Sequence, residues 1–99
     1  MTLFAVHCRD TDDSAALRQR HLQAHLDHVV KNIARYAVAG PLKDGGAAVG
    51  SLLIIRAENK EDAAAFHATD PYTTAGVWQS PRIELFSAVA GEWVGGTSW

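Results

Sequence analysis

The stretch Ser51-Leu52-Leu53-Ile54-Ile55-Arg56 decides the fold of this chain. Its apolar run is short, is bounded by polar residues and ends in two β-branched side chains, which is typical of a strand buried on both faces. Such a strand lies inside a sheet, so the rest of the chain must supply neighbouring strands and the layers that cover both faces.

Three further strands are predicted around this one. The first is segment 3–8, where apolar side chains alternate between two faces: Phe4, Val6 and Cys8 on one, and Leu3, Ala5 and His7 on the other. A short strand over 35–39 is expected to end at Gly40-Pro41, because proline lacks the amide hydrogen of a strand ladder. A flexible loop containing Gly45-Gly46 then leads to Gly50, and a last strand is predicted from about Arg82 to Val89.

Two helices are predicted between the strands. The first shows a single apolar stripe of period 3.6, formed by Leu22, Leu26, Val29, Val30 and Ile33. The second is expected to start with the capping pair Asn59 and Asp62 and to end at Asp70-Pro71, because a residue before proline is driven out of the helical region.

The resulting order, β-α-β-β-α-β, predicts an α+β, ferredoxin-like domain in which two helices cover one face of an antiparallel four-stranded sheet. The other face would expose Leu3, Ala5 and either Leu52 or Leu53, so we expect a homodimer through that face. We interpret residues 1–99 as one domain with a core over 3–89 and an irregular tail over 90–99, which contains Trp93 and Trp99.

Composition excludes several classes of function. A chain of 99 residues has room for one domain, and its net charge of −2 offers no electrostatic basis for binding nucleic acid or an anionic membrane. The amino-terminal apolar run is shorter than a signal peptide core, and no stretch has membrane-spanning length. With a single cysteine, Cys8, the expectation is a reduced thiol and a cytoplasmic location.

Histidines on the first helix are the main candidates for chemistry. His25 lies at the edge of the apolar stripe and can reach a cleft, whereas His21 and His28 lie further round on the polar side. An alternative is a metal site, because the i, i+4 spacing of His21 and His25 could chelate an ion together with His7, but no third ligand type accompanies the pair. Ordinary surface histidines are the simpler interpretation of His21 and His28.

The segment Asp70-Pro71-Tyr72 has a structural and a functional interpretation. Asp70 can cap a short helical turn that has Pro71 at its first position. A carboxylate held by backbone N–H groups is also well placed to orient a neighbouring imidazole and set its tautomer.

Several of these motifs together resemble the YCII-related (YciI-like) family over about residues 3–89. The matching stretches, in order, are Arg18, His25-Leu26-Asp27-His28-Val29, Arg35-Tyr36-Ala37-Val38-Ala39-Gly40-Pro41, Asp70-Pro71-Tyr72 and Ala75-Gly76-Val77. The resemblance implies a dimeric α/β barrel with a pocket formed by a helix histidine and the aspartate of Asp-Pro-Tyr. These carry over to His25 and Asp70; His21-Leu22 offers a second His-Leu pair, but the distance to Ala39-Gly40-Pro41 favours His25.

The resemblance also implies lyase or dehydrochlorinase chemistry on small cyclic compounds without a cofactor. On this hypothesis His25 removes a proton and Asp70 orients it, while His7, Arg18, Tyr72 and Ser87 bind polar groups of the substrate. The alternative is a non-catalytic module that binds a small molecule or serves a neighbouring enzyme, because a pocket indicates binding before it indicates turnover.

Overall fold

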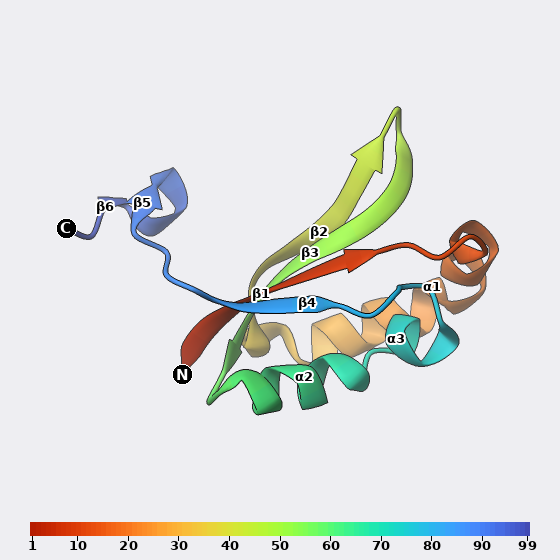
Figure 1. The fold of residues 1–99 in the computed structure, drawn as a ribbon, viewed down its shortest axis with the longest axis horizontal. Coiled ribbons are helices and arrows are strands. Elements are labelled where there is room, and N and C mark those ends of the chain that lie inside the picture. The colour runs from red at the N-terminus through yellow and green to blue at the C-terminus, as the bar shows by residue number, and fades with distance from the viewer.

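Strand β3, Ala47–Ala57, lies inside the sheet in the computed structural model of residues 1–99 (Figure 1). It pairs with β1, Thr2–Arg9, on one side and with β2, Tyr36–Asp44, on the other, and β4, Arg82–Phe86, pairs with β1. All pairs are antiparallel, and the strand order is β2-β3-β1-β4. The predicted α+β, ferredoxin-like fold is therefore confirmed.

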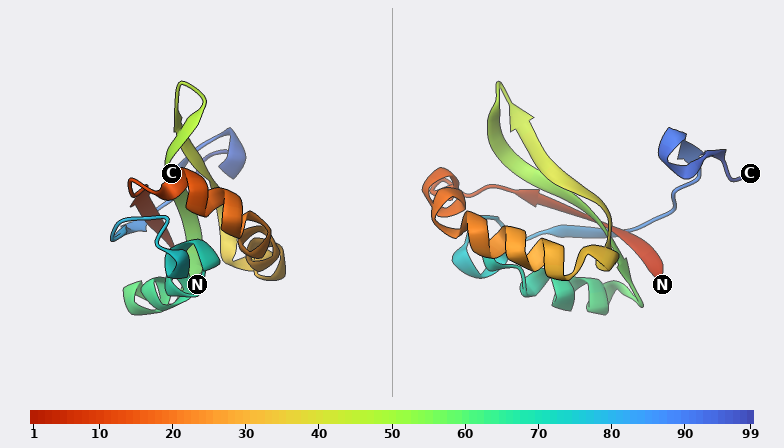
Figure 2. Two further views of the ribbon diagram at one scale, coloured as in Figure 1. Left: turned by 90° about the vertical axis from the view of Figure 1, so that its right-hand side faces the viewer. Right: turned by 180° about the vertical axis from the view of Figure 1, so that it is seen from behind.

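The helices lie together on one face of this sheet (Figures 1 and 2). They are α1, Ser14–Lys31, followed by the 3-10 turn Ile33–Arg35; α2, Lys60–Ala68; and the short α3, Pro71–Ala75. The side chain of Asn59 caps α2 by accepting the Asp62 N–H at 2.8 Å, and Asp70 caps α3, as predicted. Proline at the first position of α3 ends the preceding helical segment without leaving an unsatisfied donor.

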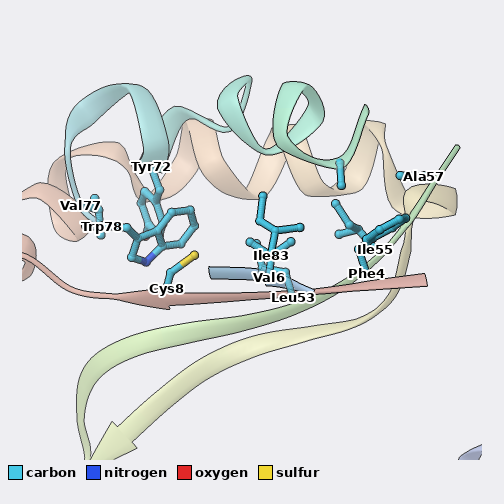
Figure 3. Close-up of a cluster of buried hydrophobic side chains, with 11 residues drawn as sticks. Phe4, Val6, Cys8, Leu53, Ile55, Ala57, Tyr72, Val77, Trp78 and Ile83 are labelled. Atoms are coloured by element: carbon cyan, nitrogen blue, oxygen red, sulfur yellow. The ribbon is translucent and has the colours of Figure 1, made fainter. Parts of the chain in front are cut away.

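The core fills the space between the sheet and the helical layer (Figure 3). Phe4, Val6 and Cys8 of β1 point into it, opposite Leu53 and Ile55 of β3, so the predicted alternation of β1 is confirmed. Burying a large apolar side chain contributes roughly 1.5–3 kcal/mol relative to leaving it exposed. The helical layer contributes Ala63, Tyr72, Val77 and Trp78.

The apolar stripe of α1 does not face this core. The period of 3.6 predicted the stripe but did not indicate which way it faces. Leu22 and Leu26 are nearly half exposed, and Val30 and Ile33 are 72% and 62% exposed. The side of α1 that faces the molecule carries Leu17, which packs against the core, together with the polar residues Arg18 and His25. Both bond to buried carboxylates, and because an unpaired buried carboxylate is very costly, these bonds fix the rotation of the helix.

The hairpin between β2 and β3 is longer than predicted. Strand β2 continues through Gly40-Pro41 to Asp44, and the expected flexible loop is the end of a two-stranded arm. Gly45 and Gly46 form its turn with φ of 59° and 91°, the positive values that a tight hairpin turn requires. Pro41 is tolerated because β2 is an edge strand, where a missing amide hydrogen leaves no neighbour unpaired.

The last strand is shorter than predicted, and the tail is partly regular. β4 ends at Phe86, not Val89, and the tail forms a small hairpin of β5, Ala90–Gly91, and β6, Gly96–Thr97, around a 3-10 turn, Glu92–Val94. This hairpin stands away from the rest of the molecule (Figures 1 and 2), and Trp93 within it is 84% exposed. Glycines occupy its left-handed positions, so local turn chemistry outweighs the alternation seen in the sequence.

The second face of the sheet carries no helix, as predicted. Leu52, Val38 and Phe86 are partly exposed there, so the stretch 51–56 is fully covered only on its helix side within one chain. A groove of about 1050 Å³, lined mainly by apolar side chains, lies between this face and the tail. None of the helices combines the length and the hydropathy that a membrane-spanning segment needs.

Candidate functional site

His25 and Asp70 form a hydrogen-bonded pair between α1 and the start of α3. Nδ1 of His25 lies 2.8 Å from Oδ1 of Asp70, and the same oxygen accepts the Tyr72 N–H at 2.9 Å. Asp70 is 1% exposed. Because the carboxylate oxygen can only accept a hydrogen bond, Nδ1 of His25 carries the ring hydrogen and donates it. The lone pair of neutral His25 is then on Nε2. Nε2 makes no hydrogen bond within the protein.

Aromatic rings hold the His25 imidazole in place. The Tyr72 ring stacks on it with centroids 4.0 Å apart and planes 4° from parallel, and Trp78 meets it edge-on at 6.2 Å. Tyr72 and Trp78 lie together at one end of the core, beside Cys8 (Figure 3). The Tyr72 hydroxyl donates to the Arg18 carbonyl at 3.1 Å, so this side chain, predicted to bind substrate, supports His25 within the protein.

Arg18 is held in a fixed orientation beside the pair. Its Nε and Nη2 donate to the two oxygens of Asp10, both at 2.8 Å, and Nη2 also reaches the Gly50 carbonyl and Ser51 Oγ. Burial pushes the pKa of Asp10 upward, but the hydrogen bonds from Arg18 and Ser14 and the Arg18 charge leave that pKa below its ordinary value. Nη1 of Arg18 makes no hydrogen bond within the protein, so it is free to donate to a ligand.

A cavity of about 220 Å³ lies between α1 and the β2–β3 hairpin. Arg18, His25 and Ser51 supply its polar wall. The rest of the wall is formed by residues without polar side-chain groups: Leu26, Val29, Ala39, Gly40, Pro41 and Leu53. A small, mainly apolar pocket with a few polar groups on its wall is the usual form of a small-molecule site.

The structure separates the other predicted residues from this cavity. His7 lies on the open face of β1, opposite Leu52 and Arg82, and Ser87 lines the groove beside that same face. Neither can reach a ligand at His25, because the sheet lies between them. His28 stacks on Phe66, and no group of three or more His, Cys, Asp or Glu side chains is arranged to hold a metal ion.

Asp10 and Ser51 belong to the site but were not identified from the sequence. Asp10 precedes Arg18 by eight residues across a helix start, and Ser51 comes from a different strand, so no local spacing links either of them to Arg18. His67, which lies close behind Asp70, was also missed. The signal that could have found it is its position three residues before the Asp-Pro-Tyr motif.

Comparison with known proteins assigns the family. The model of the YCII-related domain matches residues 2–87. The chain belongs to the YCII-related family. The predicted resemblance is thus confirmed, and with it membership of the dimeric α/β-barrel superfamily.

Two curated relatives and one solved structure support this assignment. The chain is 32% identical to Protein YciI of Escherichia coli and of Shigella flexneri, over 88% of this chain and 98% of each relative. It superposes with a TM-score of 0.79, at 28% identity, on 5-chloro-2-hydroxyhydroquinone dehydrochlorinase (TftG) from Burkholderia phenoliruptrix in complex with 2,5-dihydroxybenzoquinone. That alignment covers 91% of this chain and 96% of the dehydrochlorinase. The structural neighbours of this chain therefore include a dehydrochlorinase, which is a lyase.

Proposed function

We propose that this protein is a cofactor-independent lyase in which His25 removes a proton from a small hydroxylated ring. The observation that carries the proposal is the His25–Asp70 hydrogen bond of 2.8 Å, which leaves Nε2 as the basic nitrogen on the wall of the cavity. An imidazole is the side chain most often used as a general base at neutral pH. Asp70 orients the ring and stabilises the imidazolium that forms.

The size of the cavity selects the substrate class. An apolar cavity of about 150 Å³ accommodates benzene, so 220 Å³ suits a single substituted six-membered ring. Leu26, Val29 and Leu53 contact the ring, while Arg18 Nη1 and Ser51 Oγ bind ring oxygens. The similarity to a dehydrochlorinase of a chlorinated hydroxyhydroquinone favours the same class here.

Loss of HCl from such a ring needs no added oxidant or reductant. In a keto tautomer the chlorine is on a tetrahedral carbon. Nε2 of His25 takes a hydroxyl proton, the freed electron pair moves through the ring double bond, and chloride leaves with the C–Cl bonding pair. The products are a hydroxyquinone, chloride and a protonated histidine, which returns its proton to water.

Chloride release tests this proposal. We expect the protein, incubated without oxygen with 5-chloro-2-hydroxyhydroquinone, to release chloride faster than buffer alone. 2,5-Dihydroxybenzoquinone should raise the unfolding temperature, because a ligand at about 100 times its Kd stabilises the native state by about 2.7 kcal/mol. Stabilisation without chloride release would favour the non-catalytic binding module. If the protein shows neither stabilisation nor chloride release, this substrate class is excluded.

We also propose that the protein is a homodimer through the open sheet face. Val38, Leu52 and Phe86 form an exposed apolar surface on that face, and the tail extends beyond it with Trp93 uncovered. In a two-fold dimer each copy covers the sheet of the other with the same surface, which removes both apolar areas from water.

A charged residue on this face is expected to separate the dimer. Leu52→Lys places an ammonium group in the middle of the proposed interface, so size-exclusion chromatography with light scattering should show a monomer. Val30→Lys is the matched control, because Val30 is an exposed apolar residue of α1 that lines neither the groove of the open face nor the cavity. If Val30→Lys dissociates the protein and Leu52→Lys does not, the interface is the apolar stripe of α1 instead.

A further inference from the structure

Cys8, His67 and Asp70 form a buried cluster behind the site, and none of them lines the cavity. His67, near the end of α2, is 4% exposed, and its Nε2 lies 3.6 Å from Cys8 Sγ and 3.4 Å from Thr73 Oγ1. Its ring stacks on Trp78 with centroids 5.2 Å apart. Two buried atoms of the cluster have no hydrogen-bond partner within the protein, Nδ1 of His67 and Oδ2 of Asp70.

The neighbours of His67 determine which ring nitrogen carries its hydrogen. Burial, together with the charges of Asp70 and Asp10, raises the pKa of Cys8 to about 12 against the opposing effect of Arg18, so the thiol keeps its hydrogen. The Thr73 hydroxyl donates to the His67 carbonyl at 2.8 Å, so its hydrogen is already used. The Cys8 thiol is therefore the available donor for Nε2, which leaves the ring hydrogen on Nδ1.

His67 is uncharged at neutral pH. Burial lowers its pKa, although the nearby Asp70 carboxylate opposes this effect. A neutral imidazole has a single N–H, so if Nε2 accepts, Nδ1 donates. The Nδ1–H of His67 requires an acceptor. Asp70 Oδ2, a buried carboxylate oxygen without a partner, can supply it.

We propose that His67 is a positioning residue for the His25–Asp70 pair: its Nε2 accepts the Cys8 thiol hydrogen, and its Nδ1–H is donated toward Asp70 Oδ2 through one water. Both carboxylate oxygens are then held, Oδ1 by His25 and the Tyr72 N–H, and Oδ2 by His67. A carboxylate fixed at both oxygens stays ionised and cannot rotate away from His25. The inference rests on the proposed role of the His25–Asp70 pair as base and orienting group.

The opposite tautomer would mean a different site. With its hydrogen on Nε2, His67 would donate to Thr73 Oγ1 or Cys8 Sγ and present a bare Nδ1 lone pair toward the carboxylate. Two acceptors face each other favourably only if a hydrogen lies between them, supplied by a protonated Asp70 or by a water that donates to both. In either case His67 would donate nothing to the carboxylate. The tautomer of His67 thus shows whether His67 supplies a hydrogen toward Asp70.

NMR of the full chain labelled with ¹⁵N-histidine reads this tautomer directly. At neutral pH we expect His67 to show a protonated Nδ1 and an unprotonated Nε2 in long-range ¹H–¹⁵N spectra. An Nε2–H tautomer would overturn the inference. Because the spectrum needs no substrate, this failure differs from that of the proposed function, which would appear as absent chloride release while the Nδ1–H tautomer persists.

Two substitutions test positioning against packing. In His67→Asn the amide nitrogen can occupy the place of Nδ1, whereas in His67→Gln it reaches the place of Nε2. We expect the His25 Nδ1 proton resonance to stay in place in the asparagine variant and to move to lower field in the glutamine variant, where Asp70 Oδ1 becomes the stronger acceptor. Equal spectra from both variants would show that His67 only packs. The wild-type tautomer decides the matter if neither variant folds.

Discussion

His25→Asn is expected to lower the rate of chloride release by about 10²–10⁴-fold, the usual contribution of a positioned general base. The asparagine amide can still donate to Asp70 from the place of Nδ1, so the buried carboxylate keeps its partner. The basic Nε2, however, is lost. Anaerobic chloride-release assays on wild type and variant, with urea unfolding to confirm unchanged stability, measure the effect.

His21→Asn is the matched control, because His21 lies one turn before His25 on the same side of α1 and is outside the cavity wall. It should retain the wild-type rate. Added imidazole should also restore part of the activity of His25→Ala, because the deleted ring leaves space beside Tyr72. Loss of activity in His21→Asn, with His25→Asn unaffected, would show that the other His-Leu pair supplies the base.

The elements of the fold were predictable because each leaves a local signal. Each of three signals depends only on residues a few positions away: the period of two in β1, the capping residue Asn59 and the proline after Asp70. All three predictions hold. The sequence predicted an uncovered face but left open whether Leu52 or Leu53 lies on it, and the structure places Leu52 there. Errors occurred where edge-strand context makes a proline harmless, as at Pro41, and where glycines bend the chain after Phe86.

The rotation of α1 was not predictable from the sequence. Periodicity located the apolar stripe of Leu22, Leu26, Val29, Val30 and Ile33, but it gave no reason for the stripe to lie beside the core, where Leu26 and Val29 line the cavity and Val30 and Ile33 are exposed. The inward side is set by pairs between distant residues, such as Arg18 with Asp10 and His25 with Asp70. Such pairs leave no periodic signal, so the partners of Arg18 could only be found in the folded chain.

Asp70→Asn is expected to reduce chloride release by about 10²–10⁴-fold while leaving the protein folded, because asparagine caps a helix about as well as aspartate. The variant keeps the cap on the Tyr72 N–H but removes the charge that stabilises a protonated His25. It also weakens the acceptor that favours the Nδ1–H tautomer, because a neutral amide oxygen replaces the charged carboxylate oxygen at His25 Nδ1. Chloride-release rates compared with urea midpoints measure the two effects separately.

Asp70→Ala separates capping from charge in the same assays. Loss of the cap should cost about 1 kcal/mol of stability, whereas Asp70→Asn should lose little or even gain, because it removes a charge that is 1% exposed. If Asp70 only caps α3, the asparagine variant should remain active and only the alanine variant should lose stability. If Asp70→Asn instead loses activity but keeps its stability, the charge of Asp70 takes part in the proton transfer, since the helix that Asp70 begins does not depend on that charge.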